Sequence, residues 1–415
     1  MTCIANARPT LSIEDTTMTT PTFSPSQAEA LRRLRAVRDD MATNLVGRDR
    51  EVNGLCISLL ADCHTLLLGV PGTAKSLMAT EFARAIGLDV ESSEYFETLL
   101  GSYSNPDEVF GPYNPAKLLT GVYERNVDGY LPTAHFGFLD EIFNATAEML
   151  VTLNTILNER RMKQGTQRLN VPLKMVVGAA NVYPQGDLAL AALYDRFLLR
   201  YWTPYVETRN ENMALLRIAR DGGVKFTERL MDGDCDLIQD ACKMVHVPDN
   251  VLTALVDVRS KLGDEGVVYS DRRHMAQMRL VQAVAALDGR AVTTVKDLFI
   301  LADSVWDHHE QRATVWKTIA TIVDSALLEA RVLLDAVLVQ RNKLDMFGKD
   351  EVDDVRRPKR KARRAFNIKV KQAIREIEAN PSLDLDDPSA KQVIDKLNAQ
   401  RKEVGKAMND IDLRI

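Results

Sequence analysis

The feature that most constrains this chain is a glycine-rich loop at residues 69–76, which lies between a short apolar run and a helical pattern. The loop reads Gly69-Val-Pro-Gly-Thr-Ala-Lys-Ser76, with the β-rich run Thr65–Leu68 before it and a helical pattern from Leu77 to Ile86 after it. Such a loop aims successive backbone N–H groups at one point, and the N-terminus of the following helix adds partial positive charge. The sequence therefore predicts a strand–loop–helix unit that holds the β- and γ-phosphates of a nucleotide.

Individual residues of the loop have expected roles. Lys75 supplies a mobile cation to the phosphates, and the Ser76 hydroxyl can ligate Mg²⁺. A glycine usually precedes this lysine, but Ala74 stands there instead, and alanine is tolerable only if the position does not need a positive φ. We expect nucleotide contacts from Gly69, Pro71, Gly72, Thr73, Ala74, Lys75, Ser76 and Leu77.

An acidic pair closes a second apolar run. Residues 136–142 read Phe-Gly-Phe-Leu-Asp-Glu-Ile, so that Asp140 and Glu141 stand at the carboxyl end of the expected strand. In a parallel sheet these strand ends face the ligand crevice, beside the phosphate loop. Asp140 can therefore contribute to the Mg²⁺ shell, and Glu141 can orient and deprotonate an attacking water.

Two further polar side chains adjoin apolar runs. Asn181 follows Met175–Ala180 and is placed to hydrogen-bond the water or the γ-phosphate, although an asparagine in an ordinary turn is the alternative. Arg196 stands among apolar neighbours in Leu193-Tyr-Asp-Arg-Phe197, where an arginine could stabilise the γ-phosphate of an adjacent subunit. The alternative for Arg196 is an ion pair with Asp195 in the same chain.

The pattern of apolar residues divides the chain into segments. Strands alternate with helices over residues 24–206, which predicts an α/β core with a parallel sheet covered by helices. Residues 207–310 contain no convincing buried strand and are predicted to be all-α. We expect a C-terminal helical domain at 311–415, with three helices at about 313–346, 366–379 and 388–412, and a disordered leader at 1–23.

Composition excludes several classes of protein. No window approaches the roughly 18 apolar residues of a membrane span, and no signal peptide is present. The five cysteines form no CxxC pair, which favours buried thiols in a reducing cytoplasm. The net charge of −5 gives no global attraction for nucleic acid. Seven of the nine residues 356–364 are basic, however, and we interpret residues 351–364 as a charged, basic linker.

The order of the motifs resembles the MoxR family of AAA+ ATPases, and in particular its RavA-like branch. The resemblance covers roughly residues 25–310, and the stretch EVFGPYNP at 108–115 and the small residue Ala74 point to that branch. The motifs that carry it are VGRDREV (46–52), GVPGTAKS (69–76), FLDEI (138–142), NERR (158–161), GAAN (178–181), LYDRF (193–197) and SDRR (270–273).

The resemblance implies an AAA+ P-loop NTPase fold with an αβα core and a helical lid, working as a homo-hexameric ring with ATP and Mg²⁺ between subunits. Asn181 would be the first sensor and Arg196 the trans-acting arginine finger. Arg272 would be the second sensor, reaching the nucleotide from the lid, with the adjacent Arg273 as the alternative. Val46 and Gly47 would lie near the adenine.

The resemblance also implies two inserts, at 111–132 and at 161–172, the second a hairpin that turns at Gly165. Such inserts usually face the pore or the substrate, so Tyr113, Tyr123 and Tyr130 are candidates for contacts there, with simple packing as the alternative. The β-rich module of RavA-type proteins is missing, because mostly charged residues separate the first two C-terminal helices.

The function implied is ATP hydrolysis coupled to chaperone-like remodelling or maturation of a protein partner. MoxR relatives usually act with a partner that carries a von Willebrand factor A domain. One alternative is a nucleic-acid-dependent ATPase or translocase, for which the basic run is the only support. The other is a nucleotide-switch binding module that hydrolyses too slowly to be a motor.

Overall fold

The computed structural model describes residues 22–183, 188–324, 330, 333–334, 336–338, 356–380, 385 and 388–412. Most of the leader expected at 1–23 and the first part of the expected linker, residues 351–355, lie outside these ranges.

A five-stranded sheet forms the centre of the molecule, with the strand order β2-β3-β6-β1-β7. All four neighbouring pairs are parallel. Every residue of β1 and β6 is buried, as expected for parallel strands covered on both faces. The predicted α/β class is therefore confirmed. The strands are β1 (His64–Leu68), β2 (Tyr95–Leu99), β3 (Phe136–Asp140), β6 (Met175–Ala180) and β7 (Phe197–Trp202).

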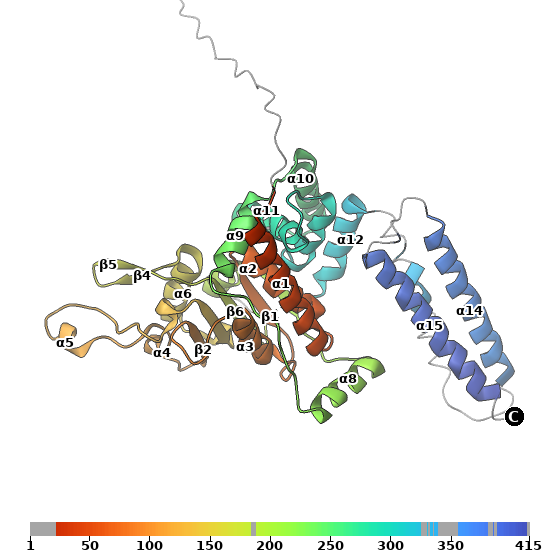
Figure 1. The fold of residues 1–415 in the computed structure, drawn as a ribbon, viewed down its shortest axis with the longest axis horizontal. Helices are drawn as coiled ribbons and strands as arrows, with labels where there is room; N and C mark the ends of the chain where they lie inside the picture. The colour runs from red at the N-terminus through yellow and green to blue at the C-terminus, as the bar shows by residue number, and fades with distance from the viewer. Residues whose placement is uncertain are drawn as a thin grey trace, which may run out of the picture.

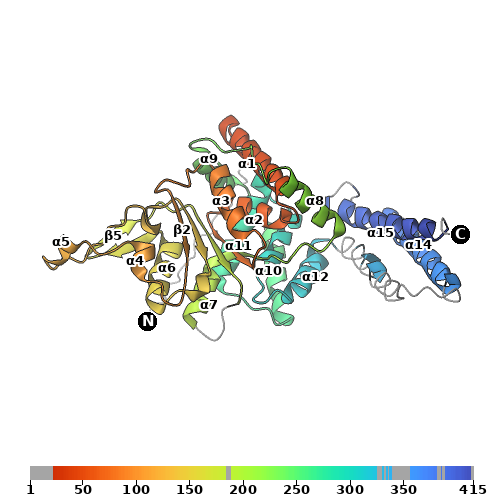
Figure 2. The same ribbon diagram turned by 90° about the horizontal axis from the view of Figure 1, so that it is seen from below.

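Helices cover both faces of this sheet. Helix α3 (Lys75–Ala85), which follows β1 and leads to β2, lies on one face of the sheet. Helices α6 (Ala147–Glu159) and α7 (Leu188–Arg196), which lead to β6 and β7, lie on the other face, as right-handed connections require (Figure 2). Ser24 and Gln27 form a capping box that starts the first helix. The helices are α1 (Pro25–Asn44), α2 (Asp49–Leu60), α3 (Lys75–Ala85), α4 (Pro106–Phe110), α6 (Ala147–Glu159) and α7 (Leu188–Arg196), with short 3₁₀ turns η1 (Leu131–Thr133) and η2 (Ile142–Asn144).

Both expected inserts are present and extend from the same end of the core (Figure 1). The first carries α5 (Pro115–Leu118) and a bridge between Tyr113 and Arg125. The second is a hairpin of β4 (Arg161–Gln164) and β5 (Gln167–Asn170), and it turns at Gly165 as predicted. The exposed rings of Tyr113 and Tyr123 meet edge to face with centroids 6.2 Å apart, so the first insert presents an aromatic pair.

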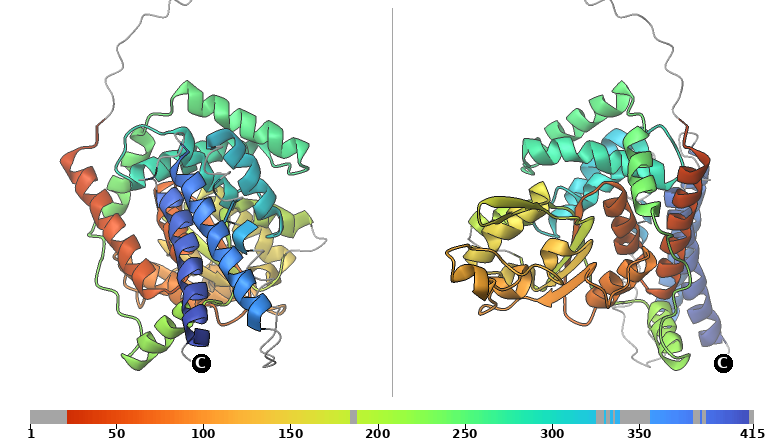
Figure 3. Two further views of the ribbon diagram at one scale, coloured as in Figure 1. Left: turned by 90° about the vertical axis from the view of Figure 1, so that its right-hand side faces the viewer. Right: turned by 60° about the vertical axis from the view of Figure 1, so that its left-hand side comes forward.

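The lid follows β7 and is helical, as predicted. It comprises α8 (Arg209–Arg220), α9 (Asp234–Met244), α10 (Asp249–Asp264), α11 (Asp271–Leu287), the 3₁₀ helix η3 (Val295–Asp303) and α12 (Gln311–Val323). Helix α8 stands apart from the other lid helices, and none of its residues is buried (Figure 3). Helix α12 packs against η3 and α10, and its Val315 and Ile319 belong to the main core. The boundary predicted at residue 310 is therefore wrong, because the lid continues to Val323.

The C-terminal region forms a smaller core of its own. Helices α14 (Arg356–Glu378) and α15 (Pro388–Asp412) lie side by side, with Val370 and Leu397 buried between them (Figure 1). Two expectations need correction here. The helix expected at 313–346 ends at Val323, because Asp324 leaves the helical conformation with φ −160°. The basic run at 356–364 is the start of α14 and not a linker, since lysine and arginine are good helix formers.

Among the residues that the structure describes, no helix combines the length and the apolar character needed to cross a membrane.

Candidate active site

The strand order brings the predicted motifs together. The phosphate loop follows β1, Asp140 ends β3 and Asn181 follows β6, and these three strands are neighbours in the order β3-β6-β1. Leu68 pairs with Ala180, so the loop and Asn181 leave the sheet at the same level. In a parallel α/β sheet, ligands usually bind beside the carboxyl ends of the strands, at the point where the connections from neighbouring strands run in opposite directions.

Lys75 is the centre of the site. Its ammonium donates to the carbonyl oxygens of Gly69 (2.8 Å) and Val70 (3.0 Å) and to Oδ1 of Asn181 (2.9 Å). Burial lowers the pKa of Lys75, and the nearby carboxylates of Asp140 and Glu141 partly oppose that shift. The cation is therefore held at the mouth of the loop and directed toward the acidic pair.

Asn181 connects this cation to the acidic pair. Its Nδ2 donates to Oε1 of Glu141, while its Oδ1 accepts from Lys75. Oδ1 of Asp140 accepts the backbone N–H of Glu141 at 2.9 Å. Glu141 itself has φ 50° and ψ 44°, a left-handed conformation that costs a non-glycine residue free energy and is typical of functional positions. The side chains of Lys75, Asn181 and Glu141 thus form one continuous network.

The donor atoms around the loop suit a nucleotide with Mg²⁺. Ser76 is exposed in the first turn of α3, and Asp140 is half-buried at the end of β3. A hydroxyl and a carboxylate supply the hard oxygen ligands that Mg²⁺ requires, and Mg²⁺ commonly uses one or two such ligands together with phosphate oxygens. The predicted metal ligands Ser76 and Asp140 therefore fit the ion.

The loop is held from behind by residues of the core. A Cβ atom on Gly69 would lie 2.4 Å from the carbonyl oxygen of Thr203, so only glycine fits there. Thr73 also faces Thr203, with their hydroxyl oxygens 3.1 Å apart. The buried Arg48 donates to the carbonyl oxygens of Thr73 (3.3 Å) and Pro204 (2.6 Å). These contacts fix the loop to the segment that follows β7.

The turn that contains Val46 and Gly47 lies beside this support, because Arg48 follows it directly. A Cβ atom on Gly47 would come within 3.5 Å of Val206, the residue that leads toward α8. This turn therefore lies beside the phosphate loop and the segment after β7. Such a position is compatible with the base-binding role predicted for Val46 and Gly47.

Ala74 corrects one expectation. It has φ 65° and ψ 25°, so this position does need the left-handed conformation that alanine disfavours. Glycine would adopt it without the steric cost, which is about 1 kcal/mol for an L-residue. The chain therefore carries local backbone strain at the start of α3, next to Lys75.

Replacing Ala74 with glycine is expected to stabilise the protein slightly, by up to about 1 kcal/mol, because it removes this strain. Thermal unfolding should show a higher midpoint for Ala74→Gly. The matched control is Ala28→Gly on the exposed side of α1, which should lower the midpoint because glycine costs about 1 kcal/mol in a helix. A lower midpoint for Ala74→Gly would contradict the strain at this position.

Arg196 lies at the opposite end of the sheet from the loop. It directly precedes β7, and β7 runs parallel to β1 with Trp202 beside Leu68. At about 3.3 Å per residue, the strand separates Arg196 from its own phosphate loop by roughly 20 Å. In the part of the chain that the structure describes, Arg196 makes no ion pair with Asp195, since the carboxylate of Asp195 accepts from Arg273 at 2.9 Å.

The two adjacent arginines of α11 are clearly distinguished. Arg273 is buried and fully engaged with the turn around Arg196, whereas Arg272 is exposed. Arg273 is therefore not available to a nucleotide. Arg272 directly precedes Arg273, whose contacts with Asp195 and Phe197 place this end of α11 beside the start of β7, at the opposite end of that strand from the phosphate loop. The role of Arg272 as second sensor stays a prediction.

The sequence interpretation missed two supporting residues, and it considered a third, Arg273, only as the alternative second sensor. Thr203 and Arg200 had no assigned role, although an arginine inside the apolar run Phe197–Trp202 is itself an unusual feature. The burial of Arg273 has a signal in the helical spacing, because Arg273, Gln277 and Leu280 share one buried face of α11.

Comparisons with known proteins identify the family of this chain. A family model described as the MoxR domain of the MoxR-vWA-beta-propeller ternary systems matches residues 32–232, and a model of an AAA lid domain matches residues 250–319. An uncharacterised protein of Methanocaldococcus jannaschii is 31% identical over 316 residues, which cover 76% of this chain and 80% of that protein. The chaperone MoxR1 of Mycobacterium tuberculosis is 24% identical, over 73% of this chain and 82% of its own.

A solved structure shows the same fold. The crystal structure of a proposed ATPase from Cytophaga hutchinsonii superposes with a TM-score of 0.57 at 20% identity, covering 72% of this chain and 95% of that one. The parallel sheet, the phosphate loop with its acidic pair and the helical lid define an ATPase of the AAA+ class. Within that class, the chain belongs to the MoxR family.

Proposed function

We propose that this chain hydrolyses ATP with Mg²⁺ at sites completed between neighbouring copies in a ring, a hexamer on the family pattern. The observation that carries the proposal is the separation of two halves of a site. Lys75, Asn181 and Glu141 meet at one end of the sheet, whereas Arg196 stands at the other, roughly 20 Å away by strand length. A head-to-tail arrangement of copies would bring the two halves together, and such contacts generate rings.

Each residue has a definite part in this proposal. The backbone N–H groups of the loop and Lys75 hold the phosphates, and Asn181 and Glu141 orient a water, from which Glu141 accepts a proton. Mg²⁺ between Ser76 and Asp140 would neutralise phosphate charge when bound. Arg196 of the adjacent copy would stabilise the charge that develops on the γ-phosphate. Arg272 is exposed at the start of α11, and its predicted role as second sensor is left outside this proposal.

We further propose that hydrolysis drives remodelling or maturation of a protein partner. MoxR1 is named a chaperone, and the matching family description couples MoxR with von Willebrand factor A and beta-propeller proteins. A partner with a von Willebrand factor A domain is therefore the first to test. The exposed Tyr113 and Tyr123 on the first insert are the candidate contacts. The RavA-like branch and a cytoplasmic location remain predictions.

The dependence of turnover on protein concentration tests the shared site. Because each site needs a second copy, ATP turnover per subunit should rise with concentration until the ring is fully assembled, and should fall on dilution. Lys75→Ala, which lacks the phosphate-binding cation, should stay inactive at every concentration. Turnover per subunit that is constant down to concentrations at which sedimentation shows only monomers would contradict the proposal.

The same assay tests the nucleic-acid alternative. The basic start of α14 is the specific feature that favours it. If the alternative holds, DNA should stimulate turnover, and the stimulation should fall with salt because it depends on phosphate contacts. No stimulation at low salt would exclude it.

A further inference from the structure

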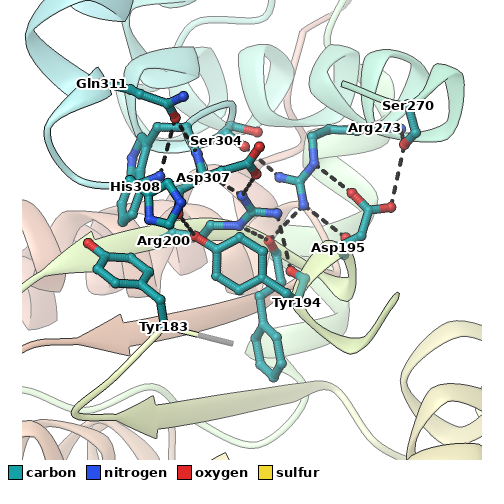
Figure 4. Close-up of polar contacts among 12 residues, drawn as sticks. Tyr183, Tyr194, Asp195, Arg200, Ser270, Arg273, Ser304, Asp307, His308 and Gln311 are labelled. Carbon is teal, nitrogen blue, oxygen red and sulfur yellow. Dashed lines mark hydrogen bonds and ion pairs between the residues drawn. The ribbon is translucent and has the colours of Figure 1, made fainter. Parts of the chain in front are cut away.

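Two buried arginines, Arg273 and Arg200, bind the backbone on both sides of Arg196. Figure 4 shows them beside Tyr194 and Asp195, the two residues before Arg196. Nη2 of Arg273 donates to the carbonyl oxygens of Asp195 (2.9 Å) and Phe197 (3.1 Å), the residues immediately before and after Arg196. Nη1 of Arg273 donates to the carbonyl of Leu198 at 3.1 Å. One guanidinium therefore binds the peptide groups that flank the predicted finger.

Arg200 repeats this arrangement from the strand itself. Its Nη2 donates to the carbonyl of Tyr194 (3.2 Å) and its Nε to that of Phe197 (3.3 Å). Its guanidinium also lies over the Tyr194 ring, 3.7 Å from the centroid. Around Arg196, the two arginines together bind four carbonyl groups. These belong to the two residues before Arg196 and the two residues after it.

Both arginines also bind the lid. Arg273 lies in the first turn of α11, and its Nη1 donates to the carbonyl oxygen of Ser304 at 2.5 Å. Nη1 of Arg200 donates to the carbonyl of Trp306 at 2.6 Å. Trp306 is fully buried, so the segment after η3 is itself anchored in the core. Movement of this part of the lid is thereby linked to the turn that carries Arg196.

Burying the guanidinium groups of Arg273 and Arg200 side by side costs electrostatic free energy, which indicates that the positions they fix in the backbone matter. Burial, with the nearby Arg200 as a second cause, lowers the pKa of Arg273 to about 10. Two buried cations side by side are unfavourable. Carbonyl groups offset them, together with the carboxylates of Asp195 on Arg273 and of Asp307 on Arg200 (3.4 Å). A planar guanidinium with five donors can, however, fix several acceptors at defined angles, which a lysine cannot.

Arg196 itself depends on this backbone support. Its Nε is buried and has no hydrogen-bond partner among the residues that the structure describes. The point from which this side chain leaves the backbone is fixed by the peptide groups on either side, which Arg273 and Arg200 bind.

We propose that Arg273 is a positioning residue, which couples the lid to the arginine finger by fixing the turn around Arg196, with Arg200 as its partner. This inference rests on the proposed trans role of Arg196. Arg273 would act through Arg196 on the nucleotide of the neighbouring copy, and would leave ATP binding by its own loop unchanged.

The test is a double-mutant cycle that combines Arg273→Lys with Arg196→Ala in the full chain. Arg273→Lys keeps the charge but loses the planar fork, so kcat should fall by roughly 10- to 100-fold, as expected when a catalytic group is misplaced by about 1 Å. KM for ATP should stay unchanged. In the Arg196→Ala background the same substitution should have no further effect on the residual turnover, because both act on one group. Arg279→Lys, an exposed arginine on the same helix, is the control and should be silent.

An equal loss of kcat in both backgrounds would overturn the proposal, and so would wild-type kcat for Arg273→Lys. If Arg273→Lys does not fold, Asp195→Asn replaces it in the cycle, because the Asp195 side chain is one-third exposed and asparagine keeps an acceptor for Nε. It should give a smaller fall in kcat that is likewise absent in the Arg196→Ala background. Normal hydrolysis by Arg196→Ala alone would instead refute the proposed function, so the two failures are distinguishable.

Discussion

Replacing Glu141 with glutamine is expected to reduce ATP turnover by a factor on the order of 10² to 10⁴, because an amide cannot accept the proton of the attacking water. ATP binding should persist, since Lys75 and the loop are unchanged. The amide oxygen of glutamine can still accept from Asn181, so the network around Lys75 should keep its geometry. Steady-state hydrolysis and equilibrium binding of a fluorescent ATP analogue measure the two effects separately.

Glu148→Gln is the matched control for this change. Glu148 is exposed in the first turn of α6 and lies outside the network, so its replacement should leave turnover unchanged. If the wild type and Glu141→Gln share the same low background rate, the chain is a nucleotide-dependent binding module and not a motor. The same comparison therefore decides between the two readings left open by the sequence.

Replacing Arg196 with alanine is expected to reduce kcat by roughly 10³- to 10⁵-fold, the usual contribution of an arginine finger. The variant should still bind ATP and assemble, because its own loop is roughly 20 Å away by strand length. Arg229→Ala, an exposed arginine before α9, is the control and should hydrolyse normally. Turnover by Arg196→Ala at the wild-type rate would show that the finger is assigned to the wrong residue.

The convergence of the predicted nucleotide-binding residues could be foreseen from the sequence, for a physical reason. The loop at 69–76, Asp140 and Asn181 each follow a short apolar run, and parallel strands place their carboxyl ends at one edge. Their convergence therefore needed only the order of motifs along the chain. The resemblance to the MoxR family added the class of fold, which the structure and the comparisons confirm.

Features that depend on long-range packing were not predictable in the same way. The position of the lid is set by contacts such as Arg273 with Asp195, which are 78 residues apart in sequence. These contacts place the start of α11, which carries Arg272, beside the start of β7, and the sequence pattern could not show this. The left-handed backbone at Ala74 was left open by the sequence, because the glycine usual at this position suggests a positive φ whereas alanine disfavours it.

Two boundary errors have local causes that could have been noticed. The helix expected to run to residue 346 ends at Val323, and Asp324 is followed by a serine, two residue types that favour helix ends over helix interiors. The basic run at 356–364 was taken for a linker on charge alone, although its residues are good helix formers. The charge of this run suggested a linker, whereas the helix propensity of its residues accounts for the helix that forms.

Mixing two inactive variants shows whether hydrolysis takes place at sites shared between copies. An Arg196→Ala subunit keeps an intact loop and Glu141 but offers no finger, whereas a Glu141→Gln subunit offers a finger but cannot use its own site. In an equal, random mixture, about a quarter of the sites combine an intact Glu141 with a neighbour's intact Arg196. The mixture is expected to recover roughly that fraction of wild-type turnover. A mixture as inactive as its two components would contradict it.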